Sequence, residues 1–202
     1  MELFICIIIG YLLGSLSPSA LLSKIKHKNL RENGTGNLGA TNTMLTFGLR
    51  YGIFVMLFDG LKAVCAIQLA RYLFPENPLS GLVAGLSTPI GHMYPFYMRF
   101  KGGKGLAAFG GCILAYDPGM FLFLFVLCVL LMLITNHSAV VPMASSVLFT
   151  IFTTWKTKSL IVFLMTSCFS LIFIHRHRDN IMKIINGDDA DIRGYFREKL
   201  SR

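Results

Sequence analysis

Charged residues are scarce in this sequence: they make up 14% of its 202 residues, whereas hydrophobic residues make up 54%. The mean hydropathy is +0.62. A chain with so little charge is too apolar for an ordinary soluble domain. We therefore predict one all-α integral membrane domain over residues 1–202, with about seven transmembrane helices.

Paired cysteines are also missing, because the five cysteines stand singly inside apolar segments, without a CxxC pair or a histidine at ligand spacing. This excludes a disulfide framework and a zinc site, and we expect small core residues instead. No nucleotide or metal motif is present, so no cofactor and no metal is expected. A basic leader with a small-residue cleavage site is absent too, so we expect the first apolar run to stay as a helix.

Seven apolar segments follow one another along the chain. They cover residues 3–23, 51–72, 80–97, 105–116, 120–135, 140–154 and 159–174. The fourth is too short for an upright span, which indicates a partial or re-entrant helix. An odd number of spans places the two termini on opposite sides of the membrane.

Lysine and arginine are distributed unevenly between the two predicted sides. Residues 24–50 carry five of them, residues 97–104 three and residues 175–202 seven, whereas the opposite side has Arg71, Lys156 and Lys158. Because cytoplasmic loops carry the excess of positive charge, the N-terminus is predicted outside and the C-terminus in the cytoplasm. The net charge of +9 is then mostly a matter of topology and does not indicate nucleic acid binding.

A glycine- and lysine-rich stretch, Lys101-Gly102-Gly103-Lys104-Gly105, lies between two apolar segments. Glycines expose backbone N–H groups and lysines supply ammonium groups, a combination that suits a phosphate. The stretch is not a P-loop, because Gly105 stands where Ser or Thr would follow the lysine. A plain flexible loop is the alternative.

A second polar motif covers residues 31–42 in the first predicted cytoplasmic loop, with the sequence RENGTGNLGATN. Its glycines permit close approach, and its hydroxyl and amide side chains suit the oxygens of a phosphorylated ligand. The alternative is a turn with Thr41 or Asn42 as the N-cap of a helix, which explains only one or two of these residues.

Further polar residues interrupt or end the apolar segments. Asp59 and Lys62 lie three residues apart on one face of the second predicted span, as a structural ion pair or as catalytic groups. Ser15 lies in the first span, on a helix-packing face or on the wall of a cavity. His175–Asn180 lies where the last span meets the cytoplasm, as interfacial residues or as part of a site.

With these motifs in this order, the sequence resembles the bacterial acyl-phosphate:glycerol-3-phosphate acyltransferases over nearly its whole length. The motifs that carry the resemblance are Gly14-Ser15, Arg31 with residues 34–42, Asp59 and Lys62, residues 91–105 and residues 176–181. The resemblance implies seven transmembrane helices in the bacterial cell membrane and a site that faces the cytoplasm. It also implies transfer of a fatty acyl group from acyl phosphate to the 1-hydroxyl of glycerol 3-phosphate, which gives lysophosphatidic acid.

The resemblance also implies roles for individual residues. Catalytic roles fall on Lys104, His177, Asn180 and Thr35, and phosphate-binding roles on Gly36, Asn37, Thr41, Asn42, Lys101, Gly102, Gly103 and Arg31. A substrate channel would include Ser15 and His92. The expected partners are acyl phosphate, glycerol 3-phosphate, membrane lipids and the peripheral enzyme that makes acyl phosphate, but not nucleic acid.

The chain departs from the family pattern at three places. Thr35 replaces a serine and keeps the hydroxyl, Leu45 replaces an arginine counted among the catalytic residues, and residues 135–142 replace a loop that contains arginine and serine. The alternatives to an active acyltransferase are therefore a weakened or inactive paralogue that binds the same substrates, and a carrier for a phosphorylated solute.

Overall fold

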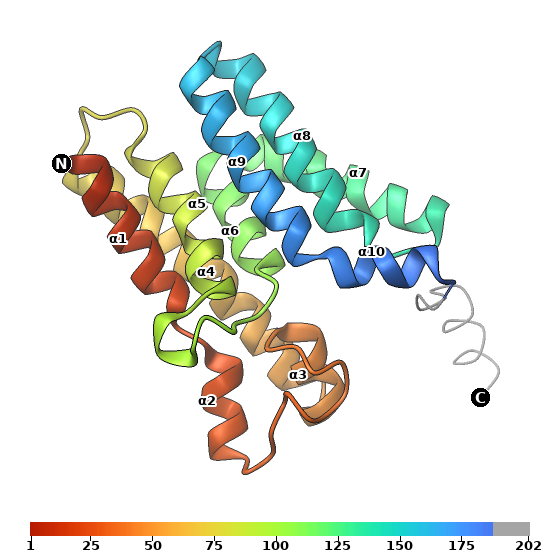
Figure 1. Ribbon diagram of the computed structural model, residues 1–202. Coiled ribbons are helices and arrows are strands. Elements are labelled where there is room, and N and C mark those ends of the chain that lie inside the picture. The colour runs from red at the N-terminus through yellow and green to blue at the C-terminus, as the bar shows by residue number, and fades with distance from the viewer. Residues whose placement is uncertain (188–202) are drawn as a thin grey trace. The chain divides into compact units, whose positions relative to one another are not determined.

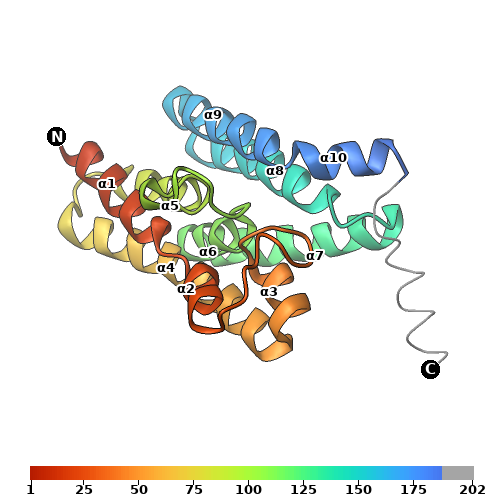
Figure 2. The same cartoon turned by 60° about the horizontal axis from the view of Figure 1, so that its bottom comes forward.

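A computed structural model describes residues 1–187, and within them all regular secondary structure is helical, without a β-strand. Figures 1 and 2 show the helices in two views. In chain order they are α1 (Glu2–Ser15), α2 (Pro18–Ile25), α3 (Ala40–Phe47), α4 (Leu49–Leu73), α5 (Ser80–Met93), the short 3₁₀ helix η1 (Phe96–Met98), α6 (Leu106–Tyr116), α7 (Pro118–Thr135), α8 (Val140–Thr157), α9 (Leu160–Arg176) and α10 (Arg178–Ile185). The all-α prediction is confirmed for this part of the chain.

Contacts between residues divide the chain into two compact units, Met1–Pro118 and the part from Gly119 onward. The first unit contains α1 to α6 and the second α7 to α10. The expectation of one domain over residues 1–202 stays a prediction.

Small residues let α1 and α5 pack closely in the first unit. A Cβ atom on Gly14 would lie 2.1 Å from the carbonyl oxygen of Thr88. One on Gly91 would lie 2.2 Å from that of Tyr11. Because no side chain fits at these distances, glycine is required where the two backbones meet, as is typical of helix pairs in membranes.

The first predicted span, residues 3–23, is not one continuous helix. α1 ends at Ser15, and α2 begins at Pro18 with the Ser17 hydroxyl accepting a hydrogen bond from the Ala20 N–H group. Proline at the first helical position and serine at the N-cap both favour a new helix start. The break frees the last carbonyl groups of α1 for other partners.

The second and third predicted spans are placed correctly at their starts. α4 covers Leu49–Leu73, close to the predicted 51–72, and α5 begins at Ser80 as predicted. However, α5 ends at Met93 instead of continuing to residue 97, because Pro95 cannot continue the helix and its ring constrains Tyr94 before it. The freed segment 94–105 leads into the short helix α6 (Leu106–Tyr116).

In the second unit, hydroxyl groups join α8 to α9. Ser170 donates to the Ser146 carbonyl at 2.9 Å, and its hydroxyl lies 3.0 Å from that of Thr150. These buried contacts hold two helices that are otherwise apolar, where hydrogen bonds between helices add to packing. α10 follows α9 after a bend of 56° at His177.

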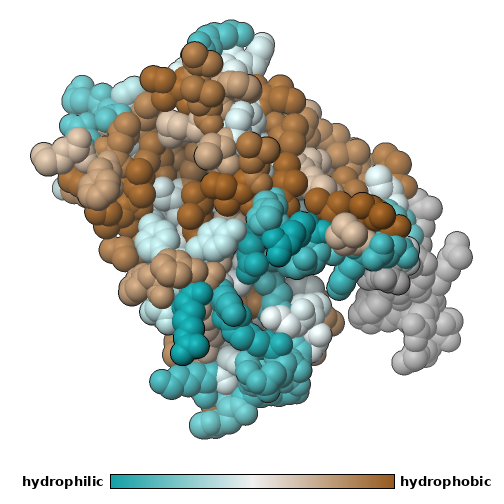
Figure 3. Space-filling view, in the orientation of Figure 1, coloured by the Kyte–Doolittle hydropathy of each residue, from teal (hydrophilic) through white to brown (hydrophobic). Residues whose placement is uncertain are grey.

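Among residues 1–187, three helical segments are long and apolar enough to cross a membrane, and four if the bent pair α9–α10 counts as one span. The three are Glu2–Ile25, Leu49–Leu73 and Pro118–Thr135. The seven predicted spans and the orientation of the termini stay predictions. Within the first unit, Figure 3 shows hydrophobic residues over α1 and hydrophilic residues gathered at the end that carries α2 and α3.

Candidate functional site

The polar loop that precedes α3 is organised around the side chain of Asn42. Asn42 is fully buried, and its Oδ1 accepts from the Thr35 N–H group at 2.7 Å. Its Nδ2 donates to the carbonyls of Leu30 at 2.8 Å and Asn37 at 2.9 Å. Both amide hydrogens are therefore used inside the protein, and Asn42 fixes the path of the loop in this structure.

Two further features give this loop its shape. Gly34 has a φ of 60°, and a Cβ there would lie 2.2 Å from Asn42 Oδ1, so only glycine fits. The side chains of Leu30 and Leu38 are buried and anchor the loop at both ends. Between these anchors Thr35 is exposed, and Thr41 is exposed on the first turn of α3. The N-cap of α3 is Gly39, so Thr41 and Asn42 lie inside the helix and neither caps it.

The glycines of the 101–105 stretch pack against the end of α5. The N–H groups of Gly102 and Gly103 donate to the carbonyls of Met93 and His92, at 2.9 and 3.1 Å. These bonds satisfy carbonyls that the end of the helix would otherwise leave unpaired. The two N–H groups therefore close α5, and the positive charge of the stretch comes from Lys101 and Lys104.

The two polar loops lie against each other in the first unit. The Arg31 guanidinium donates to the carbonyl of Lys101. Nearby, a Cβ on Gly103 would lie 2.4 Å from the Leu38 carbonyl oxygen, so glycine allows the two backbones to approach. Segments 30–42 and 101–104, about sixty residues apart in sequence, thus form one polar surface.

A basic cavity of about 410 Å³ adjoins this surface. Its lining residues are Ala20, Ser23, Lys24, His27, Lys28, Asn29, Arg31, Leu38 and Met98. Four of the nine carry or can acquire a positive charge, which favours an anion.

Helix α6 starts immediately beyond the lysines. Gly105 is its N-cap, with a φ of 83°, and accepts the first helical hydrogen bond from Phe109 at 2.8 Å. Lys104, which is half-buried, therefore stands directly before a helix N-terminus. The partial positive charge of that terminus adds to the lysine charge and favours a bound anion.

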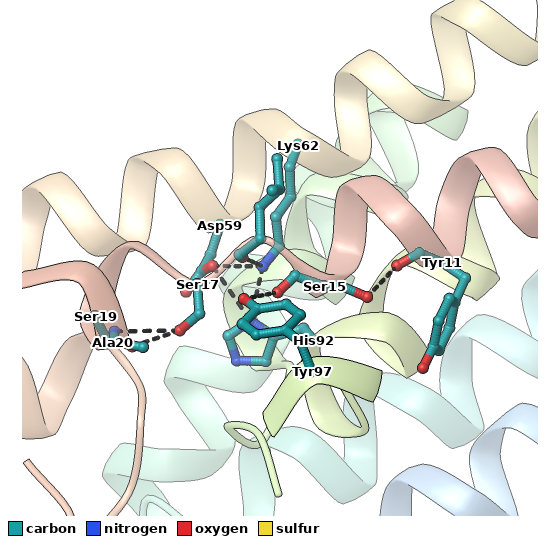
Figure 4. A network of polar contacts seen from close by, with 10 residues as sticks. Tyr11, Ser15, Ser17, Ser19, Ala20, Asp59, Lys62, His92 and Tyr97 are labelled. Carbon is teal, nitrogen blue, oxygen red and sulfur yellow. Dashed lines mark hydrogen bonds and ion pairs between the residues drawn. The ribbon is translucent and has the colours of Figure 1, made fainter. Parts of the chain in front are cut away.

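Beneath this surface a buried ionic cluster joins three helices (Figure 4). The Lys62 ammonium on α4 lies 2.7 Å from Asp59 Oδ1 and 2.8 Å from His92 Nδ1 on α5. It also donates to the carbonyl of Leu16, just after α1, at 2.9 Å. The predicted ion pair between Asp59 and Lys62 is therefore present, and it includes His92.

The two residues predicted to line a substrate channel are buried, and their polar atoms bond to the protein. The Ser15 hydroxyl donates to the Tyr11 carbonyl at 2.7 Å, and the Ser15 carbonyl accepts from the Tyr97 hydroxyl at 2.7 Å. Burial raises the pKa of Tyr97, so the hydroxyl keeps its proton and can donate. His92 belongs to the ionic cluster. Their channel role stays a prediction.

His177 and Asn180 belong to the second unit, at the bend between α9 and α10. His177 is buried, its Nδ1 lies 2.8 Å from the Phe173 carbonyl, and the Asn180 N–H group donates to the His177 carbonyl. A carbonyl only accepts, so Nδ1 carries the proton and Nε2 of the neutral ring bears the lone pair.

Three structural roles were not predicted from the sequence. They are the anchoring of the loop by Asn42, the closing of α5 by Gly102 and Gly103, and the contact between Lys62 and His92. The sequence did contain one relevant signal: an Asn on the first turn of a helix, after a glycine-rich loop, is well placed to bond to that loop.

The apolar helices and the two joined loops define an integral membrane protein with a basic surface, suited to an anion, where its helices end. A model of the family described as glycerol-3-phosphate acyltransferase matches residues 4–187. The chain belongs to this family, whose activity is acyl transfer in phospholipid synthesis.

Relatives and solved structures agree with this assignment. The chain is 34% identical over 199 residues to the glycerol-3-phosphate acyltransferase of Thermosipho melanesiensis, covering 97% of this chain and 96% of the relative. It is 34% identical over 196 residues to that of Macrococcus caseolyticus, covering 95% and 98%. The crystal structure of PlsY (YgiH), an integral membrane glycerol 3-phosphate acyltransferase, in its glycerol 3-phosphate form is 30% identical, with a TM-score of 0.85 and coverage of 95% and 96%. Its lysophosphatidic acid form is 29% identical, with a TM-score of 0.82 and coverage of 95% of each chain.

Proposed function

We propose that this chain transfers a fatty acyl group from acyl phosphate to the 1-hydroxyl of glycerol 3-phosphate, at the cytoplasmic face of the bacterial cell membrane. The observation that carries the proposal is the contact between the two polar loops, made by Arg31 and the Lys101 carbonyl. It brings lysine, arginine and hydroxyl groups to one surface, which suits a pair of phosphorylated substrates.

In the proposed reaction the glycerol hydroxyl oxygen attacks the carbonyl carbon of the acyl phosphate. The new ester bond forms as the carbon–oxygen bond to phosphate breaks, and inorganic phosphate leaves. Because phosphate is a good leaving group, the protein needs to align the substrates and stabilise charge, and needs no covalent nucleophile. A phosphate oxygen of a substrate accepts the hydroxyl proton.

The proposed residue roles are supported by the contacts of the two loops. Lys104, before the N-terminus of α6, and Lys101 neutralise phosphate charge. Thr35 and Thr41, both exposed, supply hydroxyl groups to phosphate oxygens. From the same loop, Arg31 and Asn37 supply N–H donors of their side chains, and Gly36, with a φ of 70°, lets the backbone come close to the phosphate. Asn42, Gly102 and Gly103 hold the loops in place for these contacts.

We further propose that His177 and Asn180, which belong to the second unit, orient glycerol 3-phosphate, as the resemblance implies. The base for the hydroxyl proton is then the substrate phosphate. A pH–rate profile governed by a protein histidine would contradict this assignment, whereas a profile without such a step would support the substrate phosphate as the base.

Lys104→Ala tests the proposal directly. We expect loss of about 10²-fold or more in kcat/KM for glycerol 3-phosphate, because the variant loses a charged contact to the phosphate. The assay supplies acyl phosphate and radiolabelled glycerol 3-phosphate to purified protein and measures labelled lysophosphatidic acid, with acyl-CoA as the comparison donor. Lys158→Ala, at an exposed lysine over the Trp155 ring, is the matched control and should keep its activity.

An unchanged rate in Lys104→Ala would remove this lysine from the site. Product formed from acyl-CoA but not from acyl phosphate would overturn the proposed donor while leaving the acyltransferase activity in place. A peripheral enzyme that makes acyl phosphate is the partner that this donor implies.

A further inference from the structure

The Asp59–Lys62–His92 cluster has no part in the reaction proposed above, although it lies under the loop that carries Lys104. The side chains of Asp59 and Lys62 are each 2% exposed. Burying charge costs free energy in a membrane protein unless the charges have good partners. The partners of Lys62 supply this compensation.

The Lys62 ammonium has three close polar neighbours. They are the Leu16 carbonyl at 2.9 Å, Asp59 Oδ1 at 2.7 Å and His92 Nδ1 at 2.8 Å. His92 Nδ1 also lies 3.2 Å from Asp59 Oδ1, so the imidazole contacts both members of the ion pair. Lys62, together with Asp59, thereby fixes the orientation of the imidazole.

The imidazole in turn limits where the 101–105 stretch can lie. The His92 carbonyl accepts from the Gly103 N–H group at 3.1 Å. A Cβ on Gly103 would lie 2.2 Å from His92 Nε2, so the ring edge directly faces this glycine. Gly103 is the residue before Lys104, and a rotated or displaced imidazole would move both.

The cluster also fixes the break between α1 and α2. Lys62 bonds to the carbonyl of Leu16, and Tyr97 donates to that of Ser15, so a cation and a hydroxyl satisfy the end of α1. Figure 4 shows these groups together. The segment after α5 is therefore held at two points, through His92 and through Tyr97.

We propose that Lys62 is a positioning residue for acyl transfer: its ammonium group holds His92, and His92 places Gly103 and Lys104 for the substrate phosphate. This proposal rests on the proposed function in one respect: it assumes that Lys104 contacts the substrate phosphate. The effect of Lys62 on the position of the 101–105 stretch can be tested without any substrate.

Two variants remove the link in different ways. Asp59→Asn with Lys62→Met removes both charges together, because Lys62→Met alone would leave a buried, unpaired carboxylate and destabilise the fold. His92→Leu removes the imidazole and its ring edge while the Asp59–Lys62 pair and the Leu16 bond remain. Thermal unfolding followed by far-UV circular dichroism, which reports the helices, shows whether each variant is folded.

The first measurement is trypsin cleavage after Arg99, Lys101 and Lys104 in detergent, followed by mass spectrometry. In both variants we expect the rate of cleavage in this segment to rise at least about tenfold. The reason is that Lys62 no longer holds the His92 imidazole against Gly103, so the segment opens more often. Arg71→Met is the matched control. Arg71 is another cation of α4, but it donates to the Ala115 carbonyl at the far end of α6, so its loss should leave this cleavage unchanged.

The second measurement is KM for glycerol 3-phosphate. Loss of folded protein lowers the maximal rate but leaves KM unchanged, whereas a displaced Lys104 in every folded molecule raises KM, by about tenfold for one weakened charged contact. Folded variants with wild-type cleavage and wild-type KM would overturn the proposal and leave Lys62 a stabilising role only. If the wild-type protein showed no acyl transfer, the proposed function would fail, and the cleavage result would still decide the positioning role.

Discussion

Substitution of Gly103 by alanine tests the closest contact between the two loops. The added Cβ would lie 2.4 Å from the Leu38 carbonyl oxygen and 2.2 Å from His92 Nε2. Ordinary contact begins at 3.4 Å, so the backbone has to move by about 1 Å. The Leu38 contact is with backbone, and the His92 ring is held by Lys62, so neither neighbour can move away easily.

A displacement of this size next to the reacting groups lowers the reaction rate strongly. A misplacement of about 1 Å costs on the order of 100-fold in rate, which corresponds to about 2.7 kcal/mol of transition-state stabilisation. We therefore expect Gly103→Ala to lower kcat/KM about 100-fold in the acyl phosphate assay. The thermal unfolding midpoint should fall as well, because the displaced Gly103 N–H group also helps to close the end of α5.

Gly60→Ala is the control for this prediction. Gly60 lies within α4, and a Cβ there would meet only the Ala107 carbonyl oxygen, at an ordinary 3.7 Å. Alanine in a helix interior is favoured over glycine by roughly 0.5–1 kcal/mol, so this variant should be as stable as the wild type or slightly more so, with unchanged activity. Equal losses in both variants, or a fully active Gly103→Ala, would refute the reasoning.

Two further predictions concern the first polar loop. Asn42→Ala removes three hydrogen bonds, one buried and two partly buried, and leaves the Thr35 N–H group and two carbonyls without this partner. We expect a loss of about 2–4 kcal/mol in unfolding free energy, measured by thermal or denaturant unfolding, and an unchanged stability would contradict the anchoring role. Leu45→Arg introduces the arginine that the resemblance implies, at a residue that is 62% exposed on α3, where arginine and leucine have similar helix propensity. We expect unchanged stability and a gain of about 10-fold or more in kcat/KM, because the arginine adds a charged hydrogen bond to phosphate. The absence of any gain would show that Leu45 does not weaken the activity.

The sequence predicted the helices best where hydrophobicity alone decides them. α4, α8 and α9 begin and end within a few residues of the predicted segments, because long apolar runs leave no alternative in a membrane. The break after Ser15 was missed although Ser17 and Pro18 signalled it, since the surrounding residues are apolar enough for one span. α3 was not predicted as an element, because a glycine-rich loop hides its start.

The candidate site was predictable in its residues more than in their roles. The shared polarity and the predicted side of the membrane indicated that two segments, residues 34–42 and 101–104, lie close together. The structure places the two loops in contact. The partners of Asn42 and Lys62 depended on how the chain folds back. Asn42 bonds to a carbonyl twelve residues away and Lys62 to a side chain thirty residues away, and no periodic pattern encodes such pairs.

A common physical cause connects the helix breaks with the polar residues around them. A reaction on phosphorylated substrates needs irregular backbone near the membrane, yet every helix that stops there leaves carbonyl groups unpaired. In the first unit these groups are met by the protein itself: Lys62 and Tyr97 bond to the end of α1, and Gly102 and Gly103 bond to the end of α5. The polar groups that close the helices therefore also position the loop with Lys104, so variants at Lys62 and Gly103 should affect stability and activity together, whereas variants at exposed Thr35 should affect activity alone.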